Sequence, residues 1–352
     1  MNRKKILILF GGTSPEHEVS RNSAACVARE IDREKFEVDL IGITRDGRWL
    51  LTDPEYSQMS DGSWEYLESN RPAVLSPDRS VHGYVVDGKE VHVDCVFPVF
   101  HGECGEDGTI QGMMEIAAIP YVGSDMTSSA CSMDKTVTKQ IVKETGIRQA
   151  KYYHTNRYSF ARAPLEQLDE IEELFEGKYP LFVKPSCTGS SVGISKVNDK
   201  NQLFEGIKTA LEMDKKVLIE ETINGREFET AVLGNDDIQV APVGEVISGN
   251  EFYDYEAKYS TTLQKTGIVT DVAQEKLDEF RSAAAIIYKA MGCTGMARVD
   301  FFYEDGTGDV VFNELNTIPG FTPTSMYPQM WQAGGLPYDE LITKLIELAM
   351  EE

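Results

Sequence analysis

The sequence has few basic residues relative to acidic ones, and it has no long apolar run. Its 352 residues include 34 Lys and Arg against 58 Asp and Glu, which gives a formal net charge of −24. A field of that sign repels nucleic acid and anionic membranes, so we expect neither as a partner. The apolar run at residues 6–10 is too short for a signal-peptide core, and no stretch approaches the roughly 18 residues that span a bilayer. We therefore expect a soluble, cytoplasmic protein.

Several common motifs are also missing. None of the six cysteines belongs to a C-x-x-C pair, which argues against zinc and redox sites of that kind and fits reduced thiols. No G-x-G-x-x-G follows a strand, which disfavours a Rossmann oxidoreductase. Residues 83–89 resemble a P-loop, but Glu90 stands where Ser or Thr is required and the segment lies between strands. A nucleotide would have to bind in another way.

The hydrophobic pattern is that of an α/β protein. An apolar run at 4–10, a Gly-Gly turn and an amphipathic segment at 14–32 predict the start of a doubly wound parallel-sheet domain over residues 1–123. Residues 53–90 predict a surface excursion that ends in a hairpin at Val86-Asp87-Gly88-Lys89. The alternation continues with strands at 36–44, 93–100 and 119–123 and a helix near 110–118.

Two α+β units follow, at residues 124–220 and 221–352, because a chain of this length suits two or three domains. The second unit begins with one expected helix over 128–146. The third contains a long polar loop at about 248–268. The other expected elements are strands at 180–185, 192–197, 216–221, 297–302 and 310–316, and a helix at 274–291.

The segment 183–193, VKPSCTGSSVG, places Lys184 at a strand end before a loop of small residues. Gly and Ser let backbone N–H groups approach a polyphosphate closely, and the lysine adds a point charge. A plain hairpin turn with a surface lysine explains this segment equally well when it is taken alone.

Two strand segments near the C-terminus carry the strongest local signal. Because side chains alternate along a strand, Arg298 and Asp300 share one face, as do Glu314 and Asn316 on the next strand. Two carboxylates and an amide oxygen are hard ligands that suit Mg²⁺ bound to nucleotide phosphates, whereas zinc prefers His and thiolate. The alternative is the solvent-facing polar side of a half-buried sheet.

Two glycine-containing loops are further candidates. Residues 317–322, TIPGFT, follow Asn316 and offer an N–H that could stabilise an oxyanion beside Arg298, although a structural turn is the alternative. His101 opens the loop HGECGEDG after a strand, where open α/β sheets place ligands. A lone histidine is nevertheless more often structural than catalytic.

Together these segments resemble the D-alanine–D-alanine ligase family of the ATP-grasp superfamily. The resemblance covers nearly the whole chain, and the segments occur in the family's order: GGTSPEHEVS, HGECGEDGTIQG, MDK, VKPSCTGSSVG, YEAKY, ARVDFF and NELNTIPGFT. It implies an ATP-grasp fold, in which two α+β subdomains clasp ATP. It also implies a ligase that joins two D-alanines through an acyl-phosphate for peptidoglycan synthesis. The remaining implications are two Mg²⁺ ions, for which Mn²⁺ can substitute, and a homodimer through the first domain.

The resemblance also assigns nucleotide and metal ligands by position. Many relatives carry a lysine where this chain has Glu221, so that contact is expected through the main chain. The pair Cys187-Thr188 also differs from commoner pairs in the family, and we interpret it as tolerated. The phosphates would meet Lys135, Lys184, Ser190, Ser191 and Lys258; adenine and ribose would meet Glu220, Glu221, Ile223 and Glu227; the metal ligands would be Asp300, Glu314 and Asn316.

The amino-acid substrates receive their own residues by the same resemblance. Glu16 would hold the ammonium of the first D-alanine, and Ser325 with the Met326 backbone would hold the carboxylate of the second. Arg298 and the Gly320 N–H would stabilise the tetrahedral oxyanion. His101, Ser190 and Tyr259 would complete the site. Ser190 and Tyr259 would bond to Glu16 and couple closure of a lid at about 248–268 to substrate binding.

Two alternatives stay open. A D-alanine–D-lactate or D-alanine–D-serine ligase shares the chemistry and differs in the acceptor. Tyr259 and residues 324–328 favour the dipeptide-forming branch, because depsipeptide formers lack this tyrosine and often carry Arg near position 326. A non-catalytic ATP-binding module is the second alternative. It would be expected to have lost Arg298 or the metal ligands, which are all present.

Overall fold

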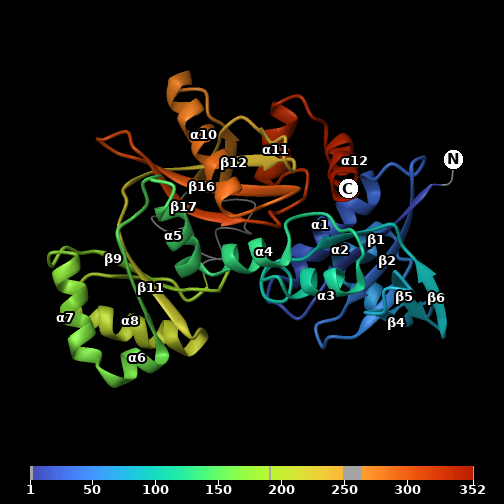
Figure 1. The fold of residues 1–352 in the computed structure, drawn as a ribbon, viewed down its shortest axis with the longest axis horizontal. Coiled ribbons are helices and arrows are strands. Elements are labelled where there is room, and N and C mark those ends of the chain that lie inside the picture. The colour runs from blue at the N-terminus through green and yellow to red at the C-terminus, as the bar shows by residue number, and fades with distance from the viewer. Residues whose placement is uncertain (1–2, 190–191, 249–263, 352) are drawn as a thin grey trace.

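A computed structural model describes residues 3–189, 192–248 and 264–351, which form three sheets with their covering helices (Figure 1). The N-terminal seven-stranded sheet and the four-stranded sheet lie toward opposite ends of the longest axis. The six-stranded sheet of the C-terminal part lies between them (Figure 1). None of the helices in the described ranges combines the length and apolar character that crossing a bilayer would need.

The N-terminal sheet is mixed, with a parallel centre and an antiparallel extension. Strand β1 (Lys4–Gly11) pairs in parallel with β2 (Phe36–Ile43) and with β7 (Cys95–Val99). Residues 53–90, expected as a surface excursion, instead extend the sheet with antiparallel strands. These strands are β4 (Arg71–Leu75), β5 (Gly83–Val86) and β6 (Lys89–His92), and β3 (Trp49–Thr52) joins them to β2.

The predicted hairpin is confirmed between β5 and β6. Asp87 and Gly88 adopt φ values of 50° and 71°, which a two-residue hairpin turn of this hand requires. The near-match to a P-loop at residues 83–89 is therefore two strands and a tight turn. The strand expected at 119–123 is reduced to an isolated bridge between Val96 and Tyr121.

Alternate side chains of β1 enter two cores, one on each face of the sheet. Ile6, Ile8 and Phe10 pack with α1 (His17–Glu30) and with the C-terminal α12 (Tyr338–Ala349). Leu7 and Leu9 pack in the core that contains α3 (Thr109–Ala117). Residues of α2 (Tyr56–Asp61) and of the 3-10 turn η1 (Ser63–Tyr66) close the first core. The last helix of the chain thus covers its first strand.

The helix expected over 128–146 is wrong, because the chain breaks at Asp134. Helix α4 (Met126–Met133) ends there and α5 (Lys135–Lys143) begins. The Asp134 carboxylate accepts the N–H groups of Thr136 and Val137 at 3.1 and 3.4 Å, and so caps α5. The break places Lys135, which lines the cavity described below, at the first position of α5.

The four-stranded sheet is antiparallel, in the order β10-β9-β11-β8. Apolar residues of this sheet and of the helices packed on it form one core. Val183, Leu203 and Ile219 belong to this core. Strand β9 ends at Pro185, immediately before the glycine-containing loop. The elements are β8 (Tyr152–Asn156), α6 (Arg157–Arg162), α7 (Pro164–Leu174), β9 (Leu181–Pro185), β10 (Ser195–Val197), α8 (Lys200–Met213) and β11 (Lys216–Glu221).

The six-stranded sheet is antiparallel and follows the order β15-β14-β12-β16-β17, with β13 paired to β12. Helix α10 covers one face through Phe280, Ala284 and Ile287, all fully buried. The loop expected at about 248–268 is wrong at its end, because Gln264–Ile268 form a strand that pairs with Gly244–Ser248, and residues 249–263 lie outside the described residues. The elements are β12 (Gly225–Leu233), β13 (Gln239–Val240), β14 (Gly244–Ser248), β15 (Gln264–Ile268), α10 (Gln274–Ala290), β16 (Met296–Glu304), β17 (Val310–Asn316) and α11 (Met326–Ala333).

Candidate active site

A cavity of about 1520 Å³ lies between the two C-terminal sheets and, from the N-terminal part, the α1 region and the loop after β7. Every predicted site residue that the structure describes lines it. Ser190, Ser191, Lys258 and Tyr259 lie outside the described residues, so the structure does not place them. The lining residues from the prediction are Glu16, His101, Lys135, Lys184, Glu220, Glu221, Ile223, Glu227, Arg298, Asp300, Glu314, Asn316, Gly320, Ser325 and Met326.

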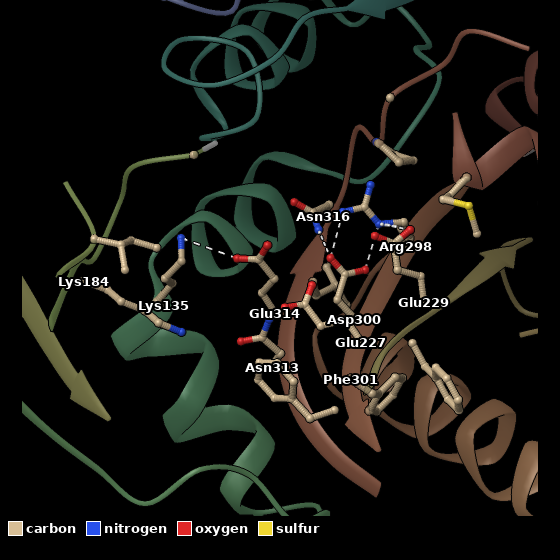
Figure 2. A pocket seen from close by; sticks show the side chains of 18 of the residues that line it. Lys135, Lys184, Glu227, Glu229, Arg298, Asp300, Phe301, Asn313, Glu314 and Asn316 are labelled. Atoms are coloured by element: carbon tan, nitrogen blue, oxygen red, sulfur yellow. Dashed lines mark hydrogen bonds and ion pairs between the residues drawn. The ribbon is translucent and has the colours of Figure 1, made fainter. Parts of the chain in front are cut away.

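The pairing of β16 with β17 brings four of these side chains together. Arg298 lies opposite Asn316, and Asp300 lies opposite Glu314. The register shifts between Asp300 and Phe301. This is the juxtaposition that strand alternation predicts, and Figure 2 shows the four side chains on one wall of the cavity.

Arg298 is held by two carboxylates. Its Nε and Nη2 donate to Asp300 Oδ1 and Oδ2 at 2.8 and 2.7 Å, and Nε lies 3.2 Å from Glu229 Oε2 (Figure 2). Burial alone would lower the pKa of Arg298, but the charges of Asp300 and Glu229 outweigh it and hold that pKa well above its ordinary value. Arg298 is therefore a permanent cation with a fixed orientation.

The residues present fit a hard divalent cation. Asp300 and Glu314 supply carboxylate oxygens, and the Asn316 amide donates from Nδ2 to Asp300 Oδ2 at 3.0 Å, which aligns it with them. Across the described ranges, no three His, Cys, Asp or Glu side chains form a group that could hold a metal by themselves. Mg²⁺ usually keeps water and takes one or two carboxylates plus substrate phosphates, so this donor set can hold it.

Two lysines enter the cavity beside those carboxylates. Lys135 Nζ donates to the Thr188 carbonyl oxygen at 2.9 Å and lies 3.8 Å from Glu314 Oε2 (Figure 2). Lys184 Nζ lies 2.5 Å from Glu220 Oε2. Lys135 thus bridges the glycine-containing loop and the carboxylate wall, and Lys184 adds a second cation, as suits a polyphosphate.

The β11–β12 connection forms another wall. Glu220, Glu221 and Ile223 lie there, and Glu227 follows on β12. The Glu221 carboxylate accepts the Lys151 N–H at 2.7 Å. The Glu221 N–H in turn donates to the Lys151 carbonyl oxygen at 3.0 Å, so the side chain and the N–H of Glu221 both bond to the main chain of Lys151.

Glu16 and His101 lie where the N-terminal unit meets the glycine-containing loop. Gly102 has φ +74°, and a Cβ there would stand 2.7 Å from Glu16 Oε2, so only glycine fits. A Cβ at Gly189 would stand 3.0 Å from the same oxygen. Burial lowers the pKa of His101, which keeps this imidazole neutral.

Glu106 shares this corner with Glu16. Its Oε2 accepts the Gly102 N–H at 2.7 Å. Burial first, and the Glu16 charge second, raise the pKa of Glu106 to about 8. The corner therefore combines the Glu16 carboxylate with a Glu106 carboxyl that is mostly protonated at neutral pH and a neutral histidine, a polar lining that leaves Glu16 to meet an ammonium group.

The loop after β17 and the start of α11 form the remaining wall. The Thr322 N–H donates to Ser325 Oγ at 3.1 Å, and a Cβ at Gly320 would stand 3.1 Å from that oxygen. Met326 is the first residue of α11. Because the first N–H groups of a helix have no partner within the helix, this end favours a carboxylate.

Sequence reasoning missed three residues of the site or its support: Glu106, Lys139 and Glu229. Glu229 lies two residues after Glu227 on the same strand, so alternation already places both on one face. Lys139 lies one helical turn after Lys135. These spacings indicate which face each residue shares. They do not predict the partners, because Arg298, the partner of Glu229, and Glu220, the partner of Lys139, come from other elements.

Comparison with known proteins decides the family. The family models described as D-ala D-ala ligase N-terminus and C-terminus match residues 5–124 and 141–347. This chain belongs to the D-alanine–D-alanine ligase family. A D-alanine–D-alanine ligase of Acetivibrio thermocellus is 47% identical over 99% of this chain and 96% of its own length. A D-alanine–D-alanine ligase of Clostridium novyi is 45% identical over 99% of this chain and 98% of its own length.

Solved structures agree with this membership of the D-alanine–D-alanine ligase family. The VanG D-Ala:D-Ser ligase of Enterococcus faecalis matches with a TM-score of 0.90 and 41% identity over 99% of this chain and 100% of that chain. The D-alanine–D-alanine ligase of Coxiella burnetii matches with a TM-score of 0.86 and 34% identity, over 99% of this chain and 95% of that chain. The D-alanine–D-alanine ligase of Bacillus anthracis, solved in complex with ATP, matches with a TM-score of 0.74 and 28% identity, over 99% of this chain and 98% of that chain. The predicted ATP-grasp fold is confirmed.

Proposed function

We propose that this chain is an ATP-dependent ligase that joins two D-alanines into the dipeptide used for peptidoglycan synthesis. The observation that carries the proposal is the cluster of Arg298, Asp300, Glu314 and Asn316 on one wall of the cavity, with Lys135 3.8 Å from Glu314. A permanent cation, hard metal donors and phosphate-binding lysines in one cavity suit phosphoryl transfer followed by acyl transfer.

The first step activates a carboxylate. The carboxylate oxygen of the first D-alanine forms a bond to the γ-phosphorus, and the bond from that phosphorus to the ADP oxygen breaks. Lys135 and Lys184 hold the phosphates, Lys258 assists by the family resemblance, and Glu220, Glu221, Ile223 and Glu227 hold adenine and ribose. Asp300, Glu314 and Asn316 would hold two Mg²⁺ ions, or Mn²⁺, which supply charge neutralisation to the phosphates when bound.

The second step forms the peptide bond. The neutral amine of the second D-alanine attacks the acyl carbon, the bond from that carbon to the phosphate oxygen breaks, and the nitrogen gives up one proton, which the leaving phosphate can take. Arg298 and the Gly320 N–H stabilise the oxyanion, which is worth roughly 3–4 kcal/mol for one well-placed donor. Ser325 and the Met326 backbone hold the carboxylate of the second D-alanine, and Glu16 with His101 holds the ammonium of the first.

Water must be excluded, because an acyl-phosphate hydrolyses readily. We propose that the segment between β14 and β15 acts as the lid and that Ser190 and Tyr259 couple it to Glu16, with Ser191 on the nucleotide. The close approach of Gly189 to Glu16 supports this coupling, since Ser190 is the next residue. The proposed units of the chain are residues 1–123, 124–220 and 221–352. We also propose that the protein is a cytoplasmic homodimer. Light scattering of the purified protein would test the dimer.

D-serine is the second candidate acceptor. The observation that favours it is the match to the VanG D-Ala:D-Ser ligase, with a TM-score of 0.90. D-lactate would give a depsipeptide by the same steps. Of the two residues that would separate the acceptors, Met326 lines the cavity and Tyr259 lies outside the described residues.

An acceptor competition tests the proposal. Purified protein is given Mg·ATP and D-alanine, alone or with equimolar D-serine or D-lactate, and phosphate release and product mass are measured. We expect D-alanyl-D-alanine as the main product in each mixture. Preference for D-serine or D-lactate would reject the acceptor assignment, and no phosphate release with any acceptor would reject the ligase.

A further inference from the structure

A buried lysine lies behind the nucleotide wall of the cavity. Lys139 of α5 has a side-chain exposure of 2% and forms an ion pair with Oε1 of Glu220, whose side chain is 4% exposed. The other oxygen of the same carboxylate, Oε2, lies 2.5 Å from Lys184 Nζ. Two ammonium groups therefore share one carboxylate in the interior.

This second cation needs a reason, because burying an ammonium group is costly and one lysine already neutralises Glu220. Lys184 and Glu220 line the cavity, whereas Lys139 lies deeper, 6.0 Å from the centre of the Tyr152 ring. Only Lys184 can therefore turn toward a bound polyphosphate. When it does so, Lys139 remains as the partner of the buried carboxylate.

The charge states agree with that arrangement. Burial alone would raise the pKa of Glu220, but Lys139 first and Lys184 second outweigh it and hold the pKa at about 2. Burial lowers the pKa of Lys139, and the Glu220 charge opposes this effect. The carboxylate thus stays ionised, and it can accept hydrogen bonds but not donate them.

We propose that Lys139 is a positioning residue for purine selection, which keeps Glu220 a pure hydrogen-bond acceptor while Lys184 contacts the phosphates. The inference rests on the proposed function, which places Glu220 against adenine. A carboxylate accepts from the 6-amino group of adenine and repels the 6-oxo group of hypoxanthine or guanine. A site built to bond a substrate amino group rejects an analogue without it, because a buried polar group is left unpaired.

Without Lys139, Glu220 must either take up a proton or keep Lys184. A protonated carboxyl has an O–H donor that can bond a 6-oxo group, so selection between ATP and ITP weakens. A retained Lys184 leaves the phosphates with one cation fewer, so KM for ATP rises. A purely structural lysine would change neither the ratio of the two nucleotides nor KM.

The experiment compares kcat/KM for ATP with that for ITP in the full-length enzyme with D-alanine. Lys139→Met removes the charge, and Lys139→Gln keeps a donor for Glu220 without the charge. We expect the ATP/ITP ratio to fall roughly 10- to 100-fold in K139M and less in K139Q. Lys143→Met is the matched control, because Lys143 lies one turn further along α5 and is exposed. Its ratio should equal that of the unchanged enzyme.

The outcomes separate this inference from the proposed function. If the unchanged enzyme releases phosphate with D-alanine but K139M and K139Q keep its ATP/ITP ratio, the inference is overturned and the ligase assignment stands. If the unchanged enzyme releases no phosphate, the proposed function itself fails. Should neither Lys139 variant fold by circular dichroism, Glu220→Gln decides. Its amide always offers an N–H, so undiminished selection in E220Q would overturn the inference.

Discussion

At the scale of single residues, Arg298 is defined by the geometry of its two carboxylate partners. Two of its nitrogens bond the two oxygens of Asp300 in parallel, and Glu229 stands 3.2 Å from Nε. A planar guanidinium can make that paired contact and still present its remaining N–H groups to a substrate. Charge alone is therefore not what the position requires.

We expect Arg298→Lys to lose activity although it keeps the charge. A lysine has one nitrogen and cannot hold Asp300 in the paired geometry. The fall should be roughly 10²- to 10³-fold in kcat, with a smaller change in the KM for D-alanine, because oxyanion stabilisation acts in the transition state. Arg226→Lys is the control: Arg226 also pairs with two carboxylates, Glu245 and Asp271, and does not line the cavity. Equal losses in both variants would contradict the assignment.

Glu314→Gln tests the metal site. The amide keeps the size of the side chain and removes a charged ligand. We expect at least a roughly 100-fold loss of turnover, weaker Mn²⁺ binding by electron paramagnetic resonance, and an unchanged circular dichroism spectrum. Asp309→Asn removes a carboxylate that is paired with Arg148 at the surface. This control should change neither turnover nor Mn²⁺ binding. Normal Mn²⁺ binding by E314Q would refute the role of Glu314.

The sequence was informative about residues that share a strand. Alternation predicts that Arg298 shares a face with Asp300 and Glu314 with Asn316, and the register confirms it. It says nothing of Glu220, whose partners Lys139 and Lys184 come from a helix and another strand. Such contacts depend on how α5 packs on the sheet, which local patterns do not encode.

At the scale of elements, the junction between α4 and α5 joins a cap to the phosphate-binding loop. Asp134 caps α5, accepts from Ser186 Oγ at 2.6 Å and forms an ion pair with Lys216. Ser186 in turn accepts the Lys135 N–H at its carbonyl oxygen, at 3.0 Å. Periodicity predicted one helix here, because the apolar pattern continues through residue 134. Asp134 instead divides this segment into α4 and α5, because an aspartate at this position caps the start of a new helix.

Asp134→Asn isolates the charge, because asparagine also caps helices. Burial would raise the pKa of Asp134, but Lys216, Ser186 and Thr136 outweigh it and lower the pKa to about 2. Since the folded-state pKa is depressed, the stabilisation is present above the ordinary value of 3.8 and is lost as the pH falls toward about 2.

We expect Asp134→Asn to lower the free energy of unfolding in urea by about 1–2 kcal/mol at pH 7, and by less at pH 3. Asp134→Ala, which loses the cap as well, should be less stable than D134N at both values. A difference between D134N and the unchanged protein that grows toward acid pH would contradict this explanation.

At the scale of the whole molecule, the two ends of the chain share a core. Leu341, Ile342, Leu345 and Ile346 of α12 are fully buried in the cluster that contains Ile6 and Ile8 of β1. The same cluster includes Tyr327 and Met330 of α11, which begins at the proposed acceptor pocket. The sequence predicted the first strand, but not that the last helix covers it, because no local signal links positions so far apart.

Leu345→Ala should therefore destabilise the molecule as a whole. Truncation of a buried leucine costs about 2–5 kcal/mol through lost burial and the cavity left behind. We expect a lower urea midpoint by circular dichroism and a single unfolding transition. Lys344→Ala, an exposed neighbour on the same helix, should stay within about 0.5 kcal/mol of the unchanged protein. A midpoint for L345A equal to that of K344A would show that this core does not join the two ends.

The central claim, activation of a carboxylate by phosphorylation, is tested most directly by an oxygen label. D-alanine with ¹⁸O in its carboxylate is turned over with unlabelled Mg·ATP in unlabelled water, and the released phosphate is analysed by mass spectrometry. The carboxylate oxygen that attacks the γ-phosphorus leaves with the phosphate in the second step. The ligase therefore predicts one ¹⁸O per phosphate for each dipeptide formed. Dipeptide formation with unlabelled phosphate would contradict an acyl-phosphate.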